Sequence, residues 1–557
     1  MKKTIKRIEL AGILTLVLLG FGLNFVSATA QETGRNRVVI KPTPTPRTTA
    51  TPVQTPVPQP TFKPTPLGTP MPAPTPVPAQ TLPELQEKIR AALARPALMR
   101  GQLGLKIISL DTGKVLFENN SEKYLMPASN MKNFTVSTAF DKLTPNFRFV
   151  TSVYAGAMPD ANGLIRGNLS IYGRGDPSIS TAFNDGDYYK GMDALAEKII
   201  AAGVKRVEGD LIGDESYFNS DAIPSTWEWD DLQWYYGAEI SALTVNDNAL
   251  DLIVRPGASV GAFASAQLLP NAYGMILNNR VTTSAAGARR DITVYRRLGS
   301  NVLELSGTIP INADKYQSAV AAYRPANVFV SMLRQLLEQK GVTITGQTRV
   351  VGIKDKTSLA VASQTAPVEI ARLESVPFSI IAAKTLKPSQ NLYTELILRT
   401  IGEQTGDKTD PKKTSEAKGL EVVQNFLAQA GIAPESVLQY DGCGLSRHDL
   451  ITPAAVTQLY SYMNTRPYAQ SWRDSLTIAG VDGTLKNRFV GTPAAGNVRG
   501  KTGTIDQVSA LSGYMTTASG ERLAFSFLVN AVPEGKLRTS TIDEIVLMLA
   551  NFNGKSN

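Results

Sequence analysis

The sequence predicts an α+β protein, in which helices cover an antiparallel β-sheet and inserted, mostly-β domains interrupt the chain. Two observations support this fold class. Helical patterns lie near both ends of the folded part, and strand patterns lie just inside them. A long middle region carries further strand patterns and two helical ones. The two ends are therefore expected to supply one sheet with its covering helices, and the middle to supply the insertions.

Residues 1–30 have the pattern of a secretory signal peptide. Four basic side chains precede an apolar run of 14 residues at 10–23, and Ala28-Thr29-Ala30 offers small residues for cleavage before Gln31. This order is typical of an export signal. The run is short for a membrane span of about 20 residues. We therefore favour cleavage and export, to the periplasm or another extracytoplasmic compartment, over an uncleaved anchor.

Residues 31–82 are predicted to be a disordered linker. Residues 42–79 contain 14 of the 34 prolines, interleaved with threonine. Such a composition cannot bury a core and favours the extended polyproline II conformation. The folded part of the chain is therefore expected to begin near residue 83.

The elements at the two ends follow from local patterns. Residues 83–95 are amphipathic and stop before Pro96, as a helix does. Alternating residues at 103–109 and 114–117 flank the turn Asp111-Thr112-Gly113 and predict a pair of strands. The C-terminal region contains three more strand patterns and a last helix, at residues 497–504, 510–516, 522–530 and 541–551.

The middle region, residues 152–351, is predicted to form one or two inserted domains. Its strand patterns lie at residues 168–172, 207–212, 250–254, 291–295 and 302–306, and its helical patterns at 192–202 and 325–340. Residues 83–151 and 352–557 would then form one domain, which carries the motifs described next.

The composition excludes several kinds of site. One cysteine, Cys443, rules out an intrachain disulfide and a Cys-rich zinc site. One histidine, His448, excludes an HExxH metalloprotease and leaves a Ser-His-Asp triad only if His448 is its base. The net charge of +9 comes without a long block of lysine or arginine, so a mildly basic surface is favoured over a nucleic-acid site.

A serine and a lysine form the first candidate motif, Ser129-x-x-Lys132. At this spacing two side chains share one face of a helix. A serine needs a base to become a nucleophile, and lysine is the available partner in a chain with one histidine. Burial or a neighbouring cation would have to lower the pKa of the lysine. By itself this pattern is more often a serine helix cap beside a surface lysine.

Two further motifs lie in the C-terminal half. Ser389-Gln390-Asn391 presents a hydroxyl and a carboxamide on a short polar turn. Lys501-Thr502-Gly503-Thr504 lies in a predicted strand, where the lysine and the threonine hydroxyls suit a carboxylate and Gly503 permits a close backbone approach by a ligand. A P-loop is excluded at this position because Ala495 stands where that motif requires its first glycine.

Together and in this order, the three motifs resemble those of the class C low-molecular-mass penicillin-binding proteins, the D-alanyl-D-alanine carboxypeptidase/endopeptidase family. The resemblance covers about residues 83–557. The long separation of Lys132 from Ser389 also resembles that class, in which inserted domains interrupt a β-lactamase-like sheet with covering helices. Further segments resemble the family too: Gly175-Asp176-Pro177, Asn391-Leu392-Tyr393, Asp441-Gly442-x-Gly444-Leu445-Ser446-Arg447 and Gly480-Val481-Asp482-Gly483-Thr484-Leu485.

The resemblance implies a mechanism. Ser129 would attack the penultimate D-alanine carbonyl of a peptidoglycan stem peptide, with Lys132 as base and Lys501 helping to depress its pKa. Ser389 would relay a proton to the leaving nitrogen, and Asn391 would orient the substrate amide or Lys132. Lys501, Thr502, Gly503 and Thr504 would form the substrate-binding strand, and the amides of Ser129 and Thr504 the oxyanion hole.

The resemblance also implies partners. β-Lactams would acylate Ser129 as covalent inhibitors, and neither a metal nor a cofactor is implied. Many relatives have other residues at Cys443 and near His448, outside the three motifs. We expect both residues to be structural, with His448 buried or capping.

Two other functions stay open at this stage. A related serine hydrolase, a β-lactamase or an esterase, would act on another acyl group. A wall-binding protein that retains the fold would lack catalysis, although every motif residue is present here. The resemblance does not separate carboxypeptidase from endopeptidase activity.

Overall fold

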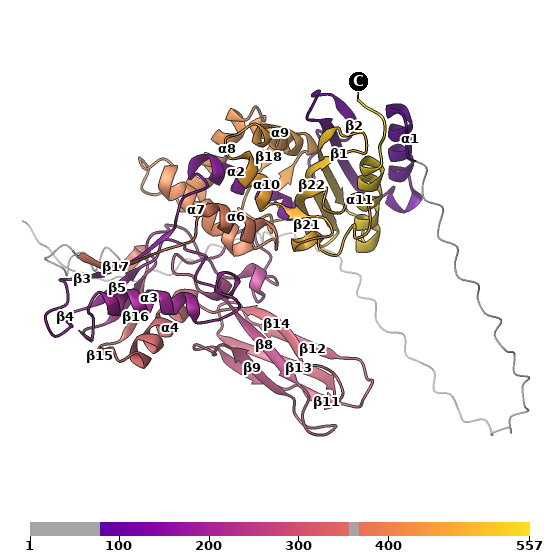
Figure 1. The fold of residues 1–557 in the computed structure, drawn as a ribbon. Helices are drawn as coiled ribbons and strands as arrows, with labels where there is room; N and C mark the ends of the chain where they lie inside the picture. Colours follow the sequence, from indigo (N-terminus) through magenta and orange to yellow (C-terminus); the bar gives the residue numbers. More distant parts are fainter. Residues whose placement is uncertain (1–77, 356–366, 557) are drawn as a thin grey trace, which may run out of the picture. The chain divides into compact units, whose positions relative to one another are not determined.

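The computed structural model describes residues 78–355 and 367–556 (Figure 1). The predicted signal peptide, and the predicted linker as far as residue 77, lie outside the described residues. Among the helices of the described part, none has both the length and the apolar character to cross a bilayer. The described residues all belong to one compact unit.

Six strands form an antiparallel sheet in the order β2-β1-β23-β22-β21-β20. They are β1 (Gln102–Ser109), β2 (Val115–Asn119), β20 (Thr477–Ile478), β21 (Arg499–Ile505), β22 (Val508–Thr516) and β23 (Arg522–Asn530). β1 pairs with β23 along its whole length, from Gln102 opposite Asn530 to Ser109 opposite Leu523. Strands from both ends of the chain share one sheet, and the predicted α+β class is confirmed.

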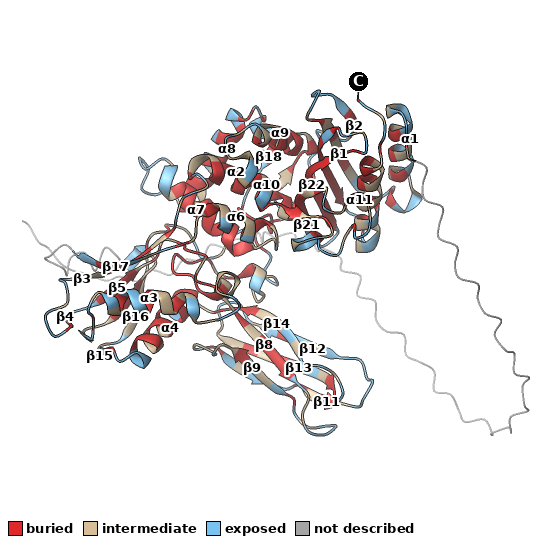
Figure 2. Cartoon of the chain, viewed as in Figure 1, coloured by how far each residue is buried: buried red, intermediate tan, exposed pale blue. Residues whose placement is uncertain are grey.

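Both faces of this sheet are buried (Figure 2). Along β22, Ala510 and Tyr514 belong to one core, whereas Leu511 and Met515 belong to another. Successive side chains of a strand point to opposite faces, so each face has its own core. One core includes α1 (Leu82–Leu93) and α11 (Gly535–Ala550), and the other includes α2 (Lys132–Lys142), α6 (Phe378–Leu386), α7 (Asn391–Thr405), α8 (Ser415–Gln429), α9 (Pro453–Asn464) and α10 (Ala469–Ser475).

Threonine caps set the start of several of these helices. The side chain of Thr81 accepts a hydrogen bond from the amide of Glu84 at the start of α1, and Thr452 does the same for Ala455 in α9. Proline occupies the first turn of both helices, where no N–H partner is needed. These local signals explain why the helix predicted at 83–95 is present as α1.

The middle region forms other sheets and another core. A five-stranded sheet has the order β16-β7-β5-β3-β17, and its core extends from Val153 to Ile370 with helices α3 and α4. Its elements are β3 (Val150–Ala155), β5 (Leu169–Tyr172), α3 (Lys190–Ala201), β7 (Leu211–Asp214), α4 (Pro325–Gln339), β16 (Thr348–Val351) and β17 (Val368–Glu374). Smaller sheets contain β4 (Leu164–Arg166), β6 (Arg206–Glu208), β8 (Ala249–Arg255), β9 (Ser265–Leu269), β10 (Ile276–Asn279), β11 (Thr282–Ser284), β12 (Asp291–Arg296), β13 (Val302–Pro310), β14 (Tyr316–Ala321) and β15 (Thr343–Ile344), and β18 (Val437–Leu438) pairs with β19 (Leu450–Ile451) outside this region.

The division into a catalytic domain and inserted domains stays a prediction. The strands β3 and β17 pair with each other in the five-stranded sheet and not in the six-stranded one. Sheet membership therefore supports limits near residues 150 and 374 for the insertion, slightly wider than the predicted 152 and 351.

Candidate active site

The candidate nucleophile Ser129 lies on a turn of 3₁₀-helix, Ala128–Met131, which leads into α2. Side chains three residues apart lie above one another in such a turn. Lys132 Nζ accordingly donates a hydrogen bond to Ser129 Oγ over 2.8 Å. Ala128 has a left-handed backbone, with φ of 47°, and strained backbone of this kind is frequent beside reactive groups. The structure thus brings the predicted pair together on a tighter turn than the predicted α-helix.

Lys132 is completely buried, and its amine donates to three oxygen atoms. Besides Ser129 Oγ, these are Asn391 Oδ1 at 2.6 Å and the carbonyl of Cys443 at 2.7 Å. Burial lowers the pKa of Lys132, although nearby acidic groups oppose the change. When the amine has lost one proton, two N–H groups still serve Asn391 and Cys443, and the lone pair faces Ser129. That is the geometry required of a general base.

Lys501 on β21 is the second buried lysine of the site. Its Nζ donates to Ser389 Oγ and to the carbonyl of Thr502, each at 2.8 Å. Burial lowers the pKa of Lys501 well below its usual range, and repulsion from Lys132 lowers it further. We predicted that Lys501 lowers the pKa of Lys132. Burial is the main cause of the lowered pKa of Lys132, and repulsion between the two amines contributes to the lowered pKa of Lys501. The carbonyl of Lys501 also accepts a hydrogen bond from Asn130 Nδ2, at 3.0 Å.

The turn between α6 and α7 presents the second motif. Ser389 has φ of 68°, and the side chain of Gln390 caps α7 by accepting from the amide of Leu392. Asn391 is the first residue of α7 and is buried. Its Oδ1 accepts from Lys132, and its Nδ2 donates to the carbonyl of Tyr236 over 2.9 Å. The middle region therefore contacts the motif directly through Tyr236.

The three motifs meet at a cavity of about 650 Å³. The predicted residues that line it are Ser129, Ser389, Asn391, Thr502 and Thr504. The lysines Lys132 and Lys501 lie beneath this lining, since both are fully buried. The cavity is thus a place where a substrate can reach the Ser129 hydroxyl with both amines below it.

Sequence reasoning did not identify several residues of the cavity wall. These are Glu228, Asp230, Asp231, Gln233, Trp234, Tyr235 and Tyr236, whereas Arg447 and Thr484 belong to segments whose resemblance to the family was noted. Arg447 Nε donates to Glu228 over 2.8 Å, and Thr502 Oγ1 donates to Thr484 Oγ1 over 2.7 Å. The dense run of acidic and aromatic residues at 227–236 is the sequence signal that could have found most of them.

Two glycines let neighbouring segments approach the nucleophile turn. A Cβ on Gly503 would lie 2.4 Å from the carbonyl oxygen of Pro127, so the nucleophile segment itself approaches closely at Gly503. The predicted close approach of a ligand at Gly503 stays a prediction. Gly444 has φ of 82°, and its Cβ would lie 1.9 Å from the carbonyl oxygen of Ala128. Both glycines thereby hold the Ser129 turn in place.

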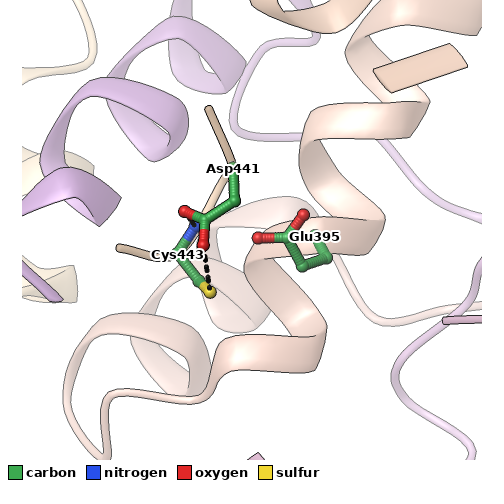
Figure 3. Close-up of side chains that lie close together, drawn as sticks. All are labelled: Glu395, Asp441 and Cys443. Carbon is green, nitrogen blue, oxygen red and sulfur yellow. Dashed lines mark hydrogen bonds between the residues drawn. The ribbon is translucent and has the colours of Figure 1, made fainter. Parts of the chain in front are cut away.

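A buried acidic cluster lies behind Lys132, formed by Glu395, Asp441 and Cys443 (Figure 3). Asp441 accepts hydrogen bonds from the amides of Cys443 and Gly444 at one oxygen, and from Trp227 Nε1 at the other. Burial raises the pKa of Glu395 to about 8 and that of Cys443 well above its usual range. The hydrogen bonds of Asp441 thus make this cluster part of a hydrogen-bonded framework.

His448 lies apart from this chemistry. The residue is exposed, and its ring packs edge-on against Tyr440 at 5.5 Å between centroids. It is not among the residues that line the cavity. Of the two roles predicted for His448, burial is wrong, because its side chain is exposed, and capping stays a prediction. Cys443 is buried, and its carbonyl accepts a hydrogen bond from Lys132.

Comparison with known proteins gives one family. A profile of the D-Ala-D-Ala carboxypeptidase 3 (S13) family matches residues 85–552. The D-alanyl-D-alanine carboxypeptidase of Actinomadura sp. (strain R39) is 34% identical over 485 residues, which cover 85% of this chain and 86% of that protein. The D-alanyl-D-alanine carboxypeptidase DacB of Haemophilus influenzae is 25% identical, over 78% of this chain and 86% of its own.

A solved structure has the same fold. The crystal structure of penicillin binding protein 4 (dacB) from Haemophilus influenzae superposes with a TM-score of 0.70 at 21% identity. The match covers 83% of this chain and 99% of that chain. At this identity the likeness concerns the fold alone.

Proposed function

The chain belongs to the D-Ala-D-Ala carboxypeptidase S13 family, and we propose that Ser129 is the nucleophile of its serine carboxypeptidase activity on peptidoglycan stem peptides. The observation that carries this assignment is the 2.8 Å contact of Lys132 Nζ with Ser129 Oγ at the cavity where the three motifs meet. Ser129 Oγ attacks the carbonyl carbon of the penultimate D-alanine, and its proton passes to the free amine of Lys132.

The other motif residues take the remaining steps. Ser389, hydrogen-bonded to Lys501, relays the proton taken up by Lys132 to the leaving nitrogen of the terminal D-alanine, so that Lys132 is a free amine again. The C–N bond breaks and leaves an ester on Ser129, which water hydrolyses with Lys132 again as base. Asn391 orients the amine of Lys132.

The substrate carboxylate binds along β21. Lys501, Thr502 and Thr504 supply a cation and two hydroxyls, and Gly503 holds the strand against the Ser129 turn. The strand β20 pairs with β21 only at Arg499 and Gly500, which leaves the edge from Lys501 onward beside the cavity. The amides of Ser129 and Thr504 then stabilise the oxyanion.

The same acyl-enzyme accounts for inhibition by β-lactams, and the peptidoglycan substrate accounts for the location of the enzyme. A β-lactam acylates Ser129 and leaves slowly, because it mimics acyl-D-alanyl-D-alanine. The enzyme works outside the cytoplasm after cleavage of residues 1–30, where peptidoglycan is found. Cleavage of a cross-linked dimer would use the same steps with a larger amine as the leaving group.

Product analysis tests this function. The protein is incubated with a purified pentapeptide muropeptide and with a cross-linked dimer, and the products are identified by mass. Release of D-alanine from the pentapeptide by the protein, and not by the Ser129→Ala variant, is expected. Rapid turnover of penicillin without action on either muropeptide would instead identify a β-lactamase, and inertness toward both would identify a wall-binding protein.

A further inference from the structure

A turn of the middle region reaches the start of α7. Residues Asn246, Asp247 and Asn248 have consecutive left-handed φ angles of 47°, 59° and 50°. Left-handed backbone is uncommon outside glycine, although Asn and Asp tolerate it better than other residues. Three such residues in a row require support from the surroundings, and strain of this kind collects at functional positions.

The two asparagines hold this turn from within the middle region. Asn248 Oδ1 accepts hydrogen bonds from Thr244 Oγ1 at 2.6 Å and from the amide of Val245 at 3.2 Å. Asn246 Nδ2 donates to the carbonyl of Tyr188 over 2.9 Å. The flanking side chains are therefore occupied in the turn, and Asp247 is left to make the contact with α7.

Asp247 accepts a hydrogen bond from the hydroxyl of Tyr393 on α7. Ser180 Oγ lies 2.9 Å from the same hydroxyl. Tyr393 is almost completely buried. The surface of Asp247 is partly exposed, but its carboxyl group is enclosed, and burial raises its pKa.

Tyr393, which Asp247 binds, lies beside the second motif. Gln390 stands between Ser389 and Asn391, and Tyr393 follows Asn391 on the first turn of α7. Asn391 Oδ1 is 2.6 Å from the amine of Lys132. Any rotation of the first turn of α7 would therefore move an acceptor away from the proposed base.

We propose that Asp247 is a positioning residue for the reaction: by binding Tyr393 on the first turn of α7, it holds Asn391 against Lys132. Asp247 does not line the cavity and touches no reacting atom. The inference rests on the proposed role of Lys132 as base. It gives the middle region a direct part in acylation, in addition to its contribution to the cavity wall.

The test compares variants chosen for the left-handed backbone. Asp247→Gly removes the carboxylate without adding strain at positive φ, whereas Asp247→Asn keeps an acceptor oxygen for Tyr393. Tyr393→Phe removes the donor from the other side. Asp185→Gly is the matched control, because Asp185 is an exposed left-handed aspartate of the same region, with φ of 57°, that pairs with Lys190.

The readout is the second-order rate constant for acylation by a fluorescent penicillin, measured across pH on folded protein. We expect Asp247→Gly and Tyr393→Phe to lower it by about 10- to 100-fold, as small misplacements of catalytic groups do. The acidic limb of the profile should move to lower pH, because an ammonium that loses an acceptor has a lower pKa. Asp247→Asn and Asp185→Gly should stay within about threefold of the unmodified protein, and the double variant of Asp247 and Tyr393 should be no worse than either single one.

Hydrogen exchange provides a second measurement, independent of acylation. The amides of the first turn of α7 should exchange faster in Asp247→Gly than in Asp185→Gly. Normal acylation and normal exchange in Asp247→Gly would overturn the positioning role. An unmodified protein that no penicillin acylates would refute the proposed function instead, and the exchange result would still decide whether Asp247 holds α7.

Discussion

At the level of single residues, the proposed chemistry depends on a lysine amine that is short of one proton near neutral pH. Burial lowers the pKa of Lys132, which favours this state, and Ser129 Oγ is one of the three oxygen atoms around its amine. Histidine, the usual partner of a nucleophilic serine, is present once and outside the cavity.

Three alanine variants separate these assignments. Ser129→Ala and Lys132→Ala should each lower labelling by a fluorescent penicillin by at least about 10²-fold, since one lacks the nucleophile and the other its base. His448→Ala should be labelled at nearly the normal rate, because His448 is exposed and away from the cavity. Circular dichroism confirms folding of each variant. Normal labelling of Lys132→Ala with loss in His448→Ala would restore the triad hypothesis.

Glu395 predicts a pH dependence of stability. Burial raises its pKa to about 8 in the folded state, while in the unfolded chain it ionises near pH 4.3. Between these values the folded state binds more protons, so this group lowers the free energy of unfolding as the pH rises from about 4.3 to 8.

The variant Glu395→Gln removes this titration and keeps an acceptor for the amide of Gly442. The melting temperature of the variant minus that of the unmodified protein should therefore increase from pH 5 to pH 8. Part of the pH dependence of stability remains in the variant, because burial also raises the pKa of Asp449. Parallel melting curves for the two proteins across this range would show that Glu395 is ionised in the fold.

At the level of elements, the 3₁₀ turn of Ser129 is held between β21 and the loop at Gly444. Neither Gly503 nor Gly444 has room for a methyl group where it contacts this turn, and these close contacts keep the turn in register with β21. Interiors packed at this density do not absorb an added carbon without displacement.

Gly503→Ala tests this packing. The new Cβ would overlap the carbonyl oxygen of Pro127, so we expect a loss of about 1–3 kcal/mol in the free energy of unfolding, and slower acylation. Gly156→Ala is the matched control, because nothing lies within 4 Å of its Cβ position and its backbone has no left-handed φ. Urea denaturation measures both variants. Equal stability of the two would mean that β21 shifts freely against the Ser129 turn.

At the level of the whole molecule, the site combines segments that are far apart in the chain. The six-stranded sheet and its helices supply Ser129, Ser389 and Lys501, and the middle region supplies the wall at residues 228–236 and the carbonyl of Tyr236. The inserted part of the chain is thus adjacent to the candidate chemistry, and we expect its loss to abolish acylation.

The predicted export signal also predicts where the mature chain begins. If residues 1–30 are a cleaved signal, N-terminal sequencing of protein recovered from outside the cytoplasm should begin near Gln31. A variant with charged residues in the apolar run at 10–23 should remain inside the cell. An intact Met1 in membrane pellets would support the anchor hypothesis instead.

The fold class and the motif residues could be predicted because their signals are local. The spacing of Ser129 and Lys132 places both on one turn, and the strand patterns at 510–516 and 522–530 are present as β22 and β23. Threonine and proline at helix starts act in the same way, through bonds within a few residues.

Only the tertiary structure decided what surrounds those residues. The carbonyls of Cys443 and Tyr236 leave no trace in a sequence, because every residue carries the same carbonyl group. The neighbour of Gly503, the carbonyl of Pro127, belongs to a segment hundreds of residues away in the chain. Such contacts join segments that are far apart in the sequence, so no local pattern predicts them. Local patterns indicate the candidate reacting side chains, and the packing of distant segments determines how those side chains are held.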